Sequence, residues 1–247
     1  MNTKNLQKLP LLVGLFAVSG MASADIYNGP DPYGPGYGFD TPTAANWGGW
    51  NRGDAGTVYA EFDVFADSSY GTASDRTSKA DAGSYGTTDA HIGWNSGTFT
   101  TGSKNLYSFS VISNFDIDLT AASSLSGPLR VAFQTEERGV PLDTATIMLN
   151  GVTPTHSSIS FTDPAYSSSF GLVTLTQRLF YWDLASATDT FHFDFAGSDH
   201  SMSFTQAAID IVPAPVPLPA AVWMFGAGLM SLLGITRRKS TAESMAA

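Results

Sequence analysis

Histidines are the first side chains to consider for acid–base or metal chemistry in this sequence. They are His91, His156, His192 and His200, and no pair stands in the spacing of a His-x-x-x-His or HExxH metal motif. The sequence also lacks Gly-x-Ser-x-Gly, the usual signal for an activated serine. We therefore interpret His192 as a solvated side chain on a strand and His200 as a turn residue.

Paired carboxylates would be needed for the hydrolysis of a glycosidic bond. Between residues 25 and 212 the glutamates are Glu61, Glu136 and Glu137. Glu136 and Glu137 are adjacent and closely precede Gly139, so we interpret them as solvated charges of a loop. The sequence thus predicts a protein that is not an enzyme, with a polysaccharide-acting hydrolase as an alternative.

Oxygen ligands for a divalent cation occur in a polar segment, residues 66–90. Asp67, Asp75 and Asp81 punctuate this segment, and Ca²⁺ prefers about six to eight oxygen ligands. Their spacing matches neither an EF-hand loop nor a glycine-aspartate nonapeptide. The three aspartates are candidate calcium ligands, with solvated loop charge as the alternative, and no other cofactor is predicted.

Tryptophans offer a second kind of site, because their flat apolar faces can cover a sugar ring. Trp47 and Trp50 are flanked by glycines in an arm rich in Gly, Pro and aromatic residues, residues 25–56. They are predicted either to contact carbohydrate or to pack onto the domain edge. Trp182 lies inside a long apolar run, and we expect it in the core.

Short β-strands must position all of these residues. Apolar and polar side chains alternate, as in Phe115, Ile117 and Leu119 with aspartates between them, and this period of two is typical of half-buried strands. The same pattern predicts strands at residues 57–65, 90–94, 98–101, 105–112, 115–119, 129–135, 145–149, 190–195 and 202–212. The long apolar stretch at residues 170–184 is predicted to form either two strands or one bent strand.

Turn signals connect these strands. Residues 95–97 are predicted to close a hairpin between 90–94 and 98–101, and Asn150-Gly151 is a second strong turn signal. Residues 66–90 are predicted to form a long polar loop. We expect an all-β protein, an antiparallel β-sandwich or jelly-roll-like ectodomain, over residues 57–212.

Composition limits the partners of this domain. Only 7 of the 12 lysine and arginine residues lie between residues 25 and 212, whereas 21 of the 22 acidic residues do, so this region carries a net charge of −14. Such acidity argues against nucleic acid as a partner, because polyanions are repelled. The absence of cysteine excludes disulfides and thiol chemistry, so the core alone must hold the fold.

The N-terminus has the three parts of a secretory signal. Lys4 and Lys8 precede an apolar run, residues 9–18, and small residues follow at Ala22 and Ala24. We predict a signal peptide at residues 1–24, removed by signal peptidase.

The C-terminus joins a proline motif, an apolar run and a cluster of cations. Val216, Pro217, Leu218 and Pro219 are followed by an uncharged stretch, residues 220–236, which is long enough for one membrane-spanning helix. Arg237, Arg238 and Lys239 come next, and such a cluster favours a cytoplasmic end for residues 237–247.

This order of parts resembles the PEP-CTERM sorting signal of Gram-negative bacteria, in a VPLP variant with Leu218 in place of the glutamate. Glycines Gly226, Gly228 and Gly234 inside the apolar run add to the resemblance. An ordinary membrane anchor would explain the helix and the cations, but not the proline motif with this glycine spacing.

The resemblance implies a processing route. An exosortase would cleave near the motif, within a linker at residues 213–219, after transient anchoring in the inner membrane. The released domain would reach the cell surface or the extracellular matrix as a structural or adhesive protein associated with exopolysaccharide. The alternative is a carbohydrate-binding module or a hydrolase on the same scaffold.

Overall fold

The computed structural model describes residues 29–65, 76–81 and 83–214. The predicted signal peptide, sorting motif, membrane helix and basic tail lie outside these residues, and so do Asp67 and Asp75. In the described ranges, the chain forms no helix with the length and apolarity that crossing a membrane requires.

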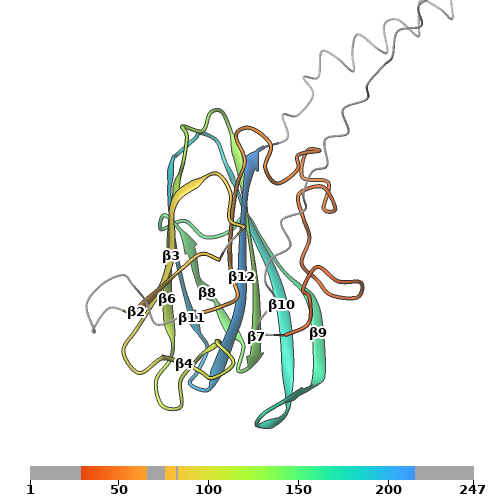
Figure 1. Cartoon of the computed structure of the whole chain (residues 1–247), viewed down its shortest axis with the longest axis vertical. Helices are drawn as coiled ribbons and strands as arrows, with labels where there is room; N and C mark the ends of the chain where they lie inside the picture. The colour runs from red at the N-terminus through yellow and green to blue at the C-terminus, as the bar shows by residue number, and fades with distance from the viewer. Residues whose placement is uncertain (1–28, 66–75, 82, 215–247) are drawn as a thin grey trace, which may run out of the picture.

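Two antiparallel sheets form the protein, which confirms the all-β prediction and is consistent with a β-sandwich (Figure 1). The seven-stranded sheet contains β1 (Val58–Phe62), β4 (Phe99–Thr100), β5 (Leu106–Tyr107), β7 (Leu129–Gly139), β9 (His156–Ser168), β10 (Gly171–Leu184) and β12 (Met202–Pro213). The five-stranded sheet contains β2 (Arg76–Lys79), β3 (Thr87–Trp94), β6 (Asn114–Ala121), β8 (Leu142–Leu149) and β11 (Thr190–Gly197).

Aromatic side chains from both sheets fill the space between them. Phe115 of β6 stacks on Phe204 of β12 with ring centroids 5.0 Å apart, and Phe133 of β7 meets Phe193 of β11 at 5.2 Å. Trp182 is buried among them, as predicted, and its indole N–H donates to the Val152 carbonyl at 2.9 Å. Burial of these large rings replaces the disulfides that the chain lacks.

The N-terminal arm covers the outer face of the seven-stranded sheet (orange in Figure 1). The Gly38 N–H donates to Gln177 Oε1 at 2.6 Å, and the Asp40 N–H donates to Gln134 Oε1 at 2.6 Å. Gln134 in turn donates from Nε2 to the Asp40 carbonyl at 2.9 Å. The arm therefore satisfies two buried glutamines that would otherwise lose their hydrogen bonds.

A charged residue of the arm reaches the same face. Arg52 donates from Nε and Nη2 to both carboxylate oxygens of Asp210, each at 2.7 Å, and its guanidinium lies 3.7 Å from the Tyr59 ring centroid. Tyr59 donates its hydroxyl hydrogen to Glu61. Burial raises the pKa of Glu61 to about 7, with the Tyr59 hydrogen bond and Arg52 acting in the opposite direction.

The predicted hairpin at residues 95–97 is wrong. β3 and β4 belong to different sheets, so this turn carries the chain across the sandwich. The second turn signal is a real turn, since Asn150 and Gly151 both have positive φ and Leu149 and Val152 exchange backbone hydrogen bonds. This turn too leads from one sheet to the other. A turn signal in the sequence predicts a local reversal of the chain, but it does not show which sheet the next strand joins.

Other strand boundaries also differ from the predictions. The strand predicted at residues 105–112 ends after Tyr107, and the predicted polar loop contains β2. For residues 170–184 the structure has the single strand β10, one of the two predicted alternatives. The long strand β9 was missed, because its serine-rich sequence has no apolar alternation.

The prediction of solvated glutamates at residues 136 and 137 is wrong. Both lie on β7 and are buried. Arg138 Nη2 contacts Glu136 Oε1 at 3.0 Å, and Arg178 Nε contacts Glu137 Oε1 at 2.5 Å. Burial raises the pKa of Glu137 to about 7. Arg138 on β7 itself and Arg178 on the neighbouring strand β10 supply opposite charges that make this burial tolerable.

Candidate functional site

The calcium candidate Asp81 has a structural role. Its Oδ2 accepts the Asp63 N–H at 2.6 Å and the Val64 N–H at 3.3 Å, so it holds the chain where β1 ends. In the ranges that the structure describes, no group of three or more His, Asp or Glu side chains is arranged to hold a metal ion. A calcium site at Asp67 and Asp75 stays a prediction, outside the described residues.

The two tryptophans of the arm pack onto the domain, the second of the predicted alternatives. Trp47 is only 5% exposed and clusters with Ala132 and Val212 on the outer face of the seven-stranded sheet. Its rings are already covered, so no sugar can stack on them in this conformation. Trp50 is half-buried beside the same cluster, and its contact with carbohydrate stays a prediction.

His192 lies on the outer face of the five-stranded sheet, as predicted. Its Nδ1 lies 2.7 Å from Asp118 Oδ1 and its Nε2 lies 3.2 Å from Asp194 Oδ1. The hydrogen bond with Asp118 raises the pKa of His192. The first contact joins β11 to β6 and the second lies within β11. Both are partly exposed ion pairs, which contribute little to stability.

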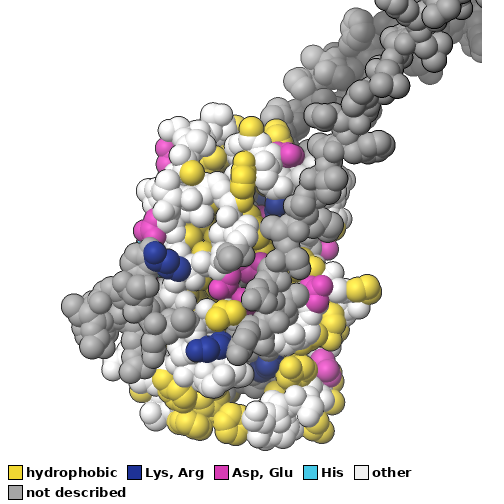
Figure 2. Space-filling model, viewed as in Figure 1, with side chains coloured by type: hydrophobic (Ala, Val, Ile, Leu, Met, Phe, Trp, Pro, Cys, Tyr) yellow, Lys and Arg dark blue, Asp and Glu magenta, His cyan; other side chains and the backbone are white. Residues whose placement is uncertain are grey.

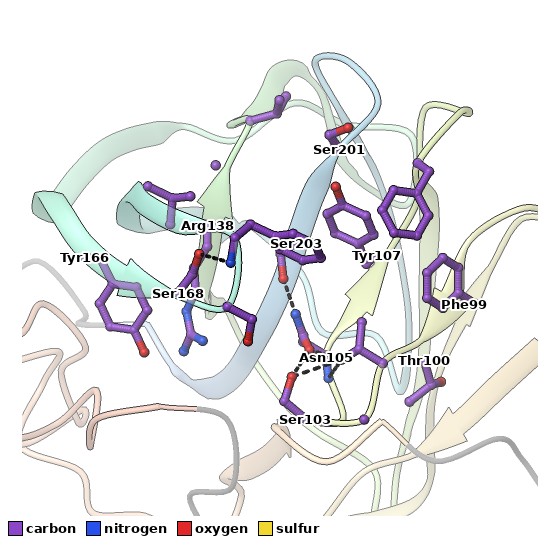
Figure 3. Close-up of a pocket in the computed structure, with 18 of the residues that line it drawn as sticks. Phe99, Thr100, Ser103, Asn105, Tyr107, Arg138, Tyr166, Ser168, Ser201 and Ser203 are labelled. Carbon is purple, nitrogen blue, oxygen red and sulfur yellow. Dashed lines mark hydrogen bonds between the residues drawn. The ribbon is translucent and has the colours of Figure 1, made fainter.

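A groove at one end of the sandwich is the strongest candidate site. Its volume is about 1040 Å³, and it lies among the β4–β5 hairpin, the end of β7, the β9–β10 hairpin and the start of β12. Figure 2 shows hydrophobic side chains gathered at the end of the molecule where β4 lies. In Figure 3, Phe99 and Tyr107 stand on one side of the groove and Arg138 and Tyr166 on the other.

Four aromatic rings form a cluster in this groove. Phe99 stacks with Phe109, their ring centroids 5.7 Å apart, and Tyr107 stacks with Phe170, also at 5.7 Å. Phe109 is 61% exposed and Phe170 is 73% exposed. Exposed aromatic faces in a concave site are available for a ligand.

Hydrogen-bonding groups line the floor between the rings. Asn105 donates from Nδ2 to Ser203 and accepts at Oδ1 from Thr101 and Ser103, so its amide orientation is fixed (Figure 3). The other hydroxyl groups of the lining belong to Thr100, Tyr107, Tyr166, Ser167, Ser168, Ser169 and Ser201. This mixture of apolar faces and hydroxyl groups matches the two kinds of surface that a sugar presents.

The positive charge that Arg138 brings to the groove is balanced by a buried carboxylate. Among the residues that the structure describes, the lining includes Arg138 and no Asp or Glu. Arg138 contacts the buried Glu136 at 3.0 Å and lies over the Tyr166 ring, with 4.6 Å between the guanidinium carbon and the ring centroid. Glu136 therefore neutralises Arg138, the one cation among the described residues of the lining.

Local turns put the exposed rings at the rim. After β5 ends, the Ser108 hydroxyl accepts the N–H groups of Ser110 and Val111, which turns the chain away from the sheet before β6. At the β9–β10 hairpin, Ser168 Oγ accepts the Phe170 N–H, and Gly171 adopts a positive φ. Side chains at such turns point outward because no strand partner covers them.

Sequence reasoning missed this groove. Phe109 was assigned to one face of a strand, and Phe170 to the start of another. Serine triplet 167–169 directly before Phe170 and Gly171 is a turn signal that indicates a hairpin tip. Only the fold brings this tip beside the β4–β5 hairpin.

No family model, curated protein or solved structure matches this chain.

Proposed function

We propose that this is a secreted, surface- or matrix-sorted protein that binds exopolysaccharide in the groove. The exposed aromatic side chains of Phe109 and Phe170, next to the oriented Asn105 amide and many hydroxyl groups, are the observation that carries the proposal. Aromatic rings cover the apolar faces of sugars, while amide and hydroxyl groups exchange hydrogen bonds with sugar hydroxyls.

Binding is favoured over hydrolysis at this site by the residues that line it. Glycosidases use two carboxylates on opposite sides of the scissile bond. In the described part of the chain the groove lining contains neither Asp nor Glu, and Glu136, which contacts Arg138, is fully buried. The groove therefore has the residues for holding a glycan, and its lining lacks the residues for that mechanism.

The sorting part of the proposal rests on the two ends of the sequence. Signal peptidase would remove residues 1–24, and an exosortase would cut near Pro217 after a period in the inner membrane. The last strand, β12, ends at Pro213, before the Val216–Pro219 motif. A cut near Pro217 would thus leave the described sheets intact in the released protein.

Binding is tested with the purified secreted protein and exopolysaccharide from the producing cells. Phe109→Ala and Phe170→Ala should each weaken retention about tenfold, which corresponds to about 1.4 kcal/mol. Ile159→Ala is the matched control, because Ile159 is exposed on β9 but does not line the groove. Unchanged retention in both Phe variants would show that the groove is not the binding site.

Sorting is tested by mass spectrometry of protein recovered from the cell surface or matrix. The chain should begin near Asp25 and end near Pro217. Replacement of Pro217 and Pro219 by alanine should leave the protein in the inner membrane. Surface material that still extends to Ala247 would contradict processing by an exosortase.

A further inference from the structure

The two exposed rings of the groove lie in different planes. Phe109 and Phe170 have ring centroids 6.3 Å apart and an interplanar angle of 88°. Tyr107 contacts both, with its ring nearly parallel to Phe170 at 16° and nearly perpendicular to Phe109 at 77°. Phe99 stacks on Phe109 at 28°. Phe99 thus supports Phe109, and Tyr107 supports Phe170. We call the two exposed rings, Phe109 and Phe170, the platforms of the groove; their planes are nearly perpendicular.

This arrangement restricts the shape of a bound glycan. A sugar ring that stacks on an aromatic ring lies parallel to it. Two sugars of one chain can therefore stack on both platforms only if the planes of the two sugar rings differ by a large angle. The platforms are separated by a distance comparable with the size of one pyranose ring. In a flat ribbon, successive rings stay near one plane and only one platform could be used. In a chain that winds, successive rings turn and both platforms could be used.

Charge restricts the ligand further. Arg138 is neutralised by Glu136 and stacked against Tyr166, so the described lining of the groove offers no unbalanced cation to attract an acidic sugar. The whole chain carries a net charge of −10, which opposes the approach of a polyanion. An uncharged glycan avoids this repulsion.

We infer that the groove binds a single winding chain of uncharged sugars, in preference to a flat ribbon or an acidic polysaccharide. This inference rests on the proposed function and names the class of glycan for the same groove. It follows from the perpendicular Phe109 and Phe170 platforms and from the ion pair that neutralises Arg138.

The test compares four glycans with the purified secreted protein. Two are uncharged winding chains, a soluble β-1,3-glucan and amylose; cellulose is the flat ribbon, and alginate is the acidic chain. Dissociation constants should be at least tenfold lower for one of the winding chains than for cellulose and alginate. Equal or tighter binding of cellulose or alginate would overturn this inference and leave the proposed function standing. Binding of none of the four would overturn this inference as well, and retention on exopolysaccharide from the producing cells then decides the proposed function separately.

Variants test whether both platforms are used. Phe109→Ala and Phe170→Ala should each weaken binding of the preferred glucan about tenfold, whereas Ile159→Ala should not change it. All three side chains are exposed, and near-UV circular dichroism checks that each variant keeps its packed core. Loss of affinity in only one of the two Phe variants would overturn the two-platform arrangement.

Discussion

Arg52 and Arg130 make the same bidentate contact with an aspartate in different surroundings. Arg52 holds Asp210 at 2.7 Å through both nitrogens, and Arg130 holds Asp183 at 2.7 and 2.8 Å. The side chain of Asp210 is 1% exposed, whereas that of Asp183 is 45% exposed. If the arginine is lost, water can solvate the exposed Asp183 but not the buried Asp210. Loss of the Arg52–Asp210 pair should therefore cost more stability than loss of the Arg130–Asp183 pair.

Substitution of the two arginines measures this difference. Arg52→Ala should lower the free energy of unfolding by about 3 kcal/mol or more, because it leaves a buried carboxylate unpaired. Arg130→Ala, the matched control, should lower it by less than about 1 kcal/mol. Urea denaturation at pH 7 provides the measurement, and similar losses in both variants would refute the role of burial.

Gly38 is required by the close approach of the arm to β9. A Cβ at this position would lie 2.7 Å from the Ser160 carbonyl carbon and 2.8 Å from its Cβ, which is too close for atoms of a strand. Gly38→Ala should therefore destabilise the protein by about 1–3 kcal/mol. Gly102→Ala is the control, since a Cβ there meets nothing within 4 Å. Equal thermal midpoints for the two variants would contradict this packing.

At the scale of elements, the edge strand β9 carries features that oppose pairing with another chain. Its register with β10 skips Ser160 and shifts again near Pro164, so the strand is irregular at two places. Pro164 has no N–H to offer a neighbouring strand. Irregularity and proline are the usual protections of an exposed edge.

Pro164→Thr tests this protection. The substitution restores an N–H and a strand-forming side chain, so the variant should self-associate at concentrations where the wild type does not. Ser158→Thr is the control, because it adds a β-branched residue to β9 without a new backbone donor. Sedimentation velocity compares the three proteins, and identical sedimentation would show that Pro164 does not protect the edge.

For the whole molecule, buried acids make stability depend on pH. Burial raises the pKa of Glu61 and Glu137 to about 7, from ordinary values near 4.5. Between these values the folded protein keeps protons that the unfolded chain releases. Stability therefore falls as pH rises from about 4.5 to about 7, and changes little above that.

The free energy of unfolding should accordingly be higher at pH 5 than at pH 8, by about 3 kcal/mol if one such carboxyl dominates. Glu61→Gln should reduce this slope, because the amide does not titrate. Urea denaturation across this range measures both proteins. A stability that increases with pH would mean that these carboxyls are ionised in the folded state.

Local pattern was enough to predict the class of fold and much of its core. Alternation placed Phe115, Ile117 and Leu119 inside, and it did the same for Phe193 and Phe195; all five are buried. This works because neighbouring side chains of a strand point to opposite faces, whatever the strand pairs with. Strands in segments with that alternation were thus predictable, while serine-rich β9 was not.

The sequence by itself determined the alternating core and the turn at Asn150-Gly151, and the signals at the two ends stay predictions from it. Only the tertiary structure decided that Glu136 is buried against Arg138, that Trp47 of the arm packs onto the seven-stranded sheet, and that Phe109 and Phe170 meet in one groove. The physical reason is that these features depend on which distant segments become neighbours. That choice is made by packing of the two sheets and the arm together, and no local period of the sequence records it.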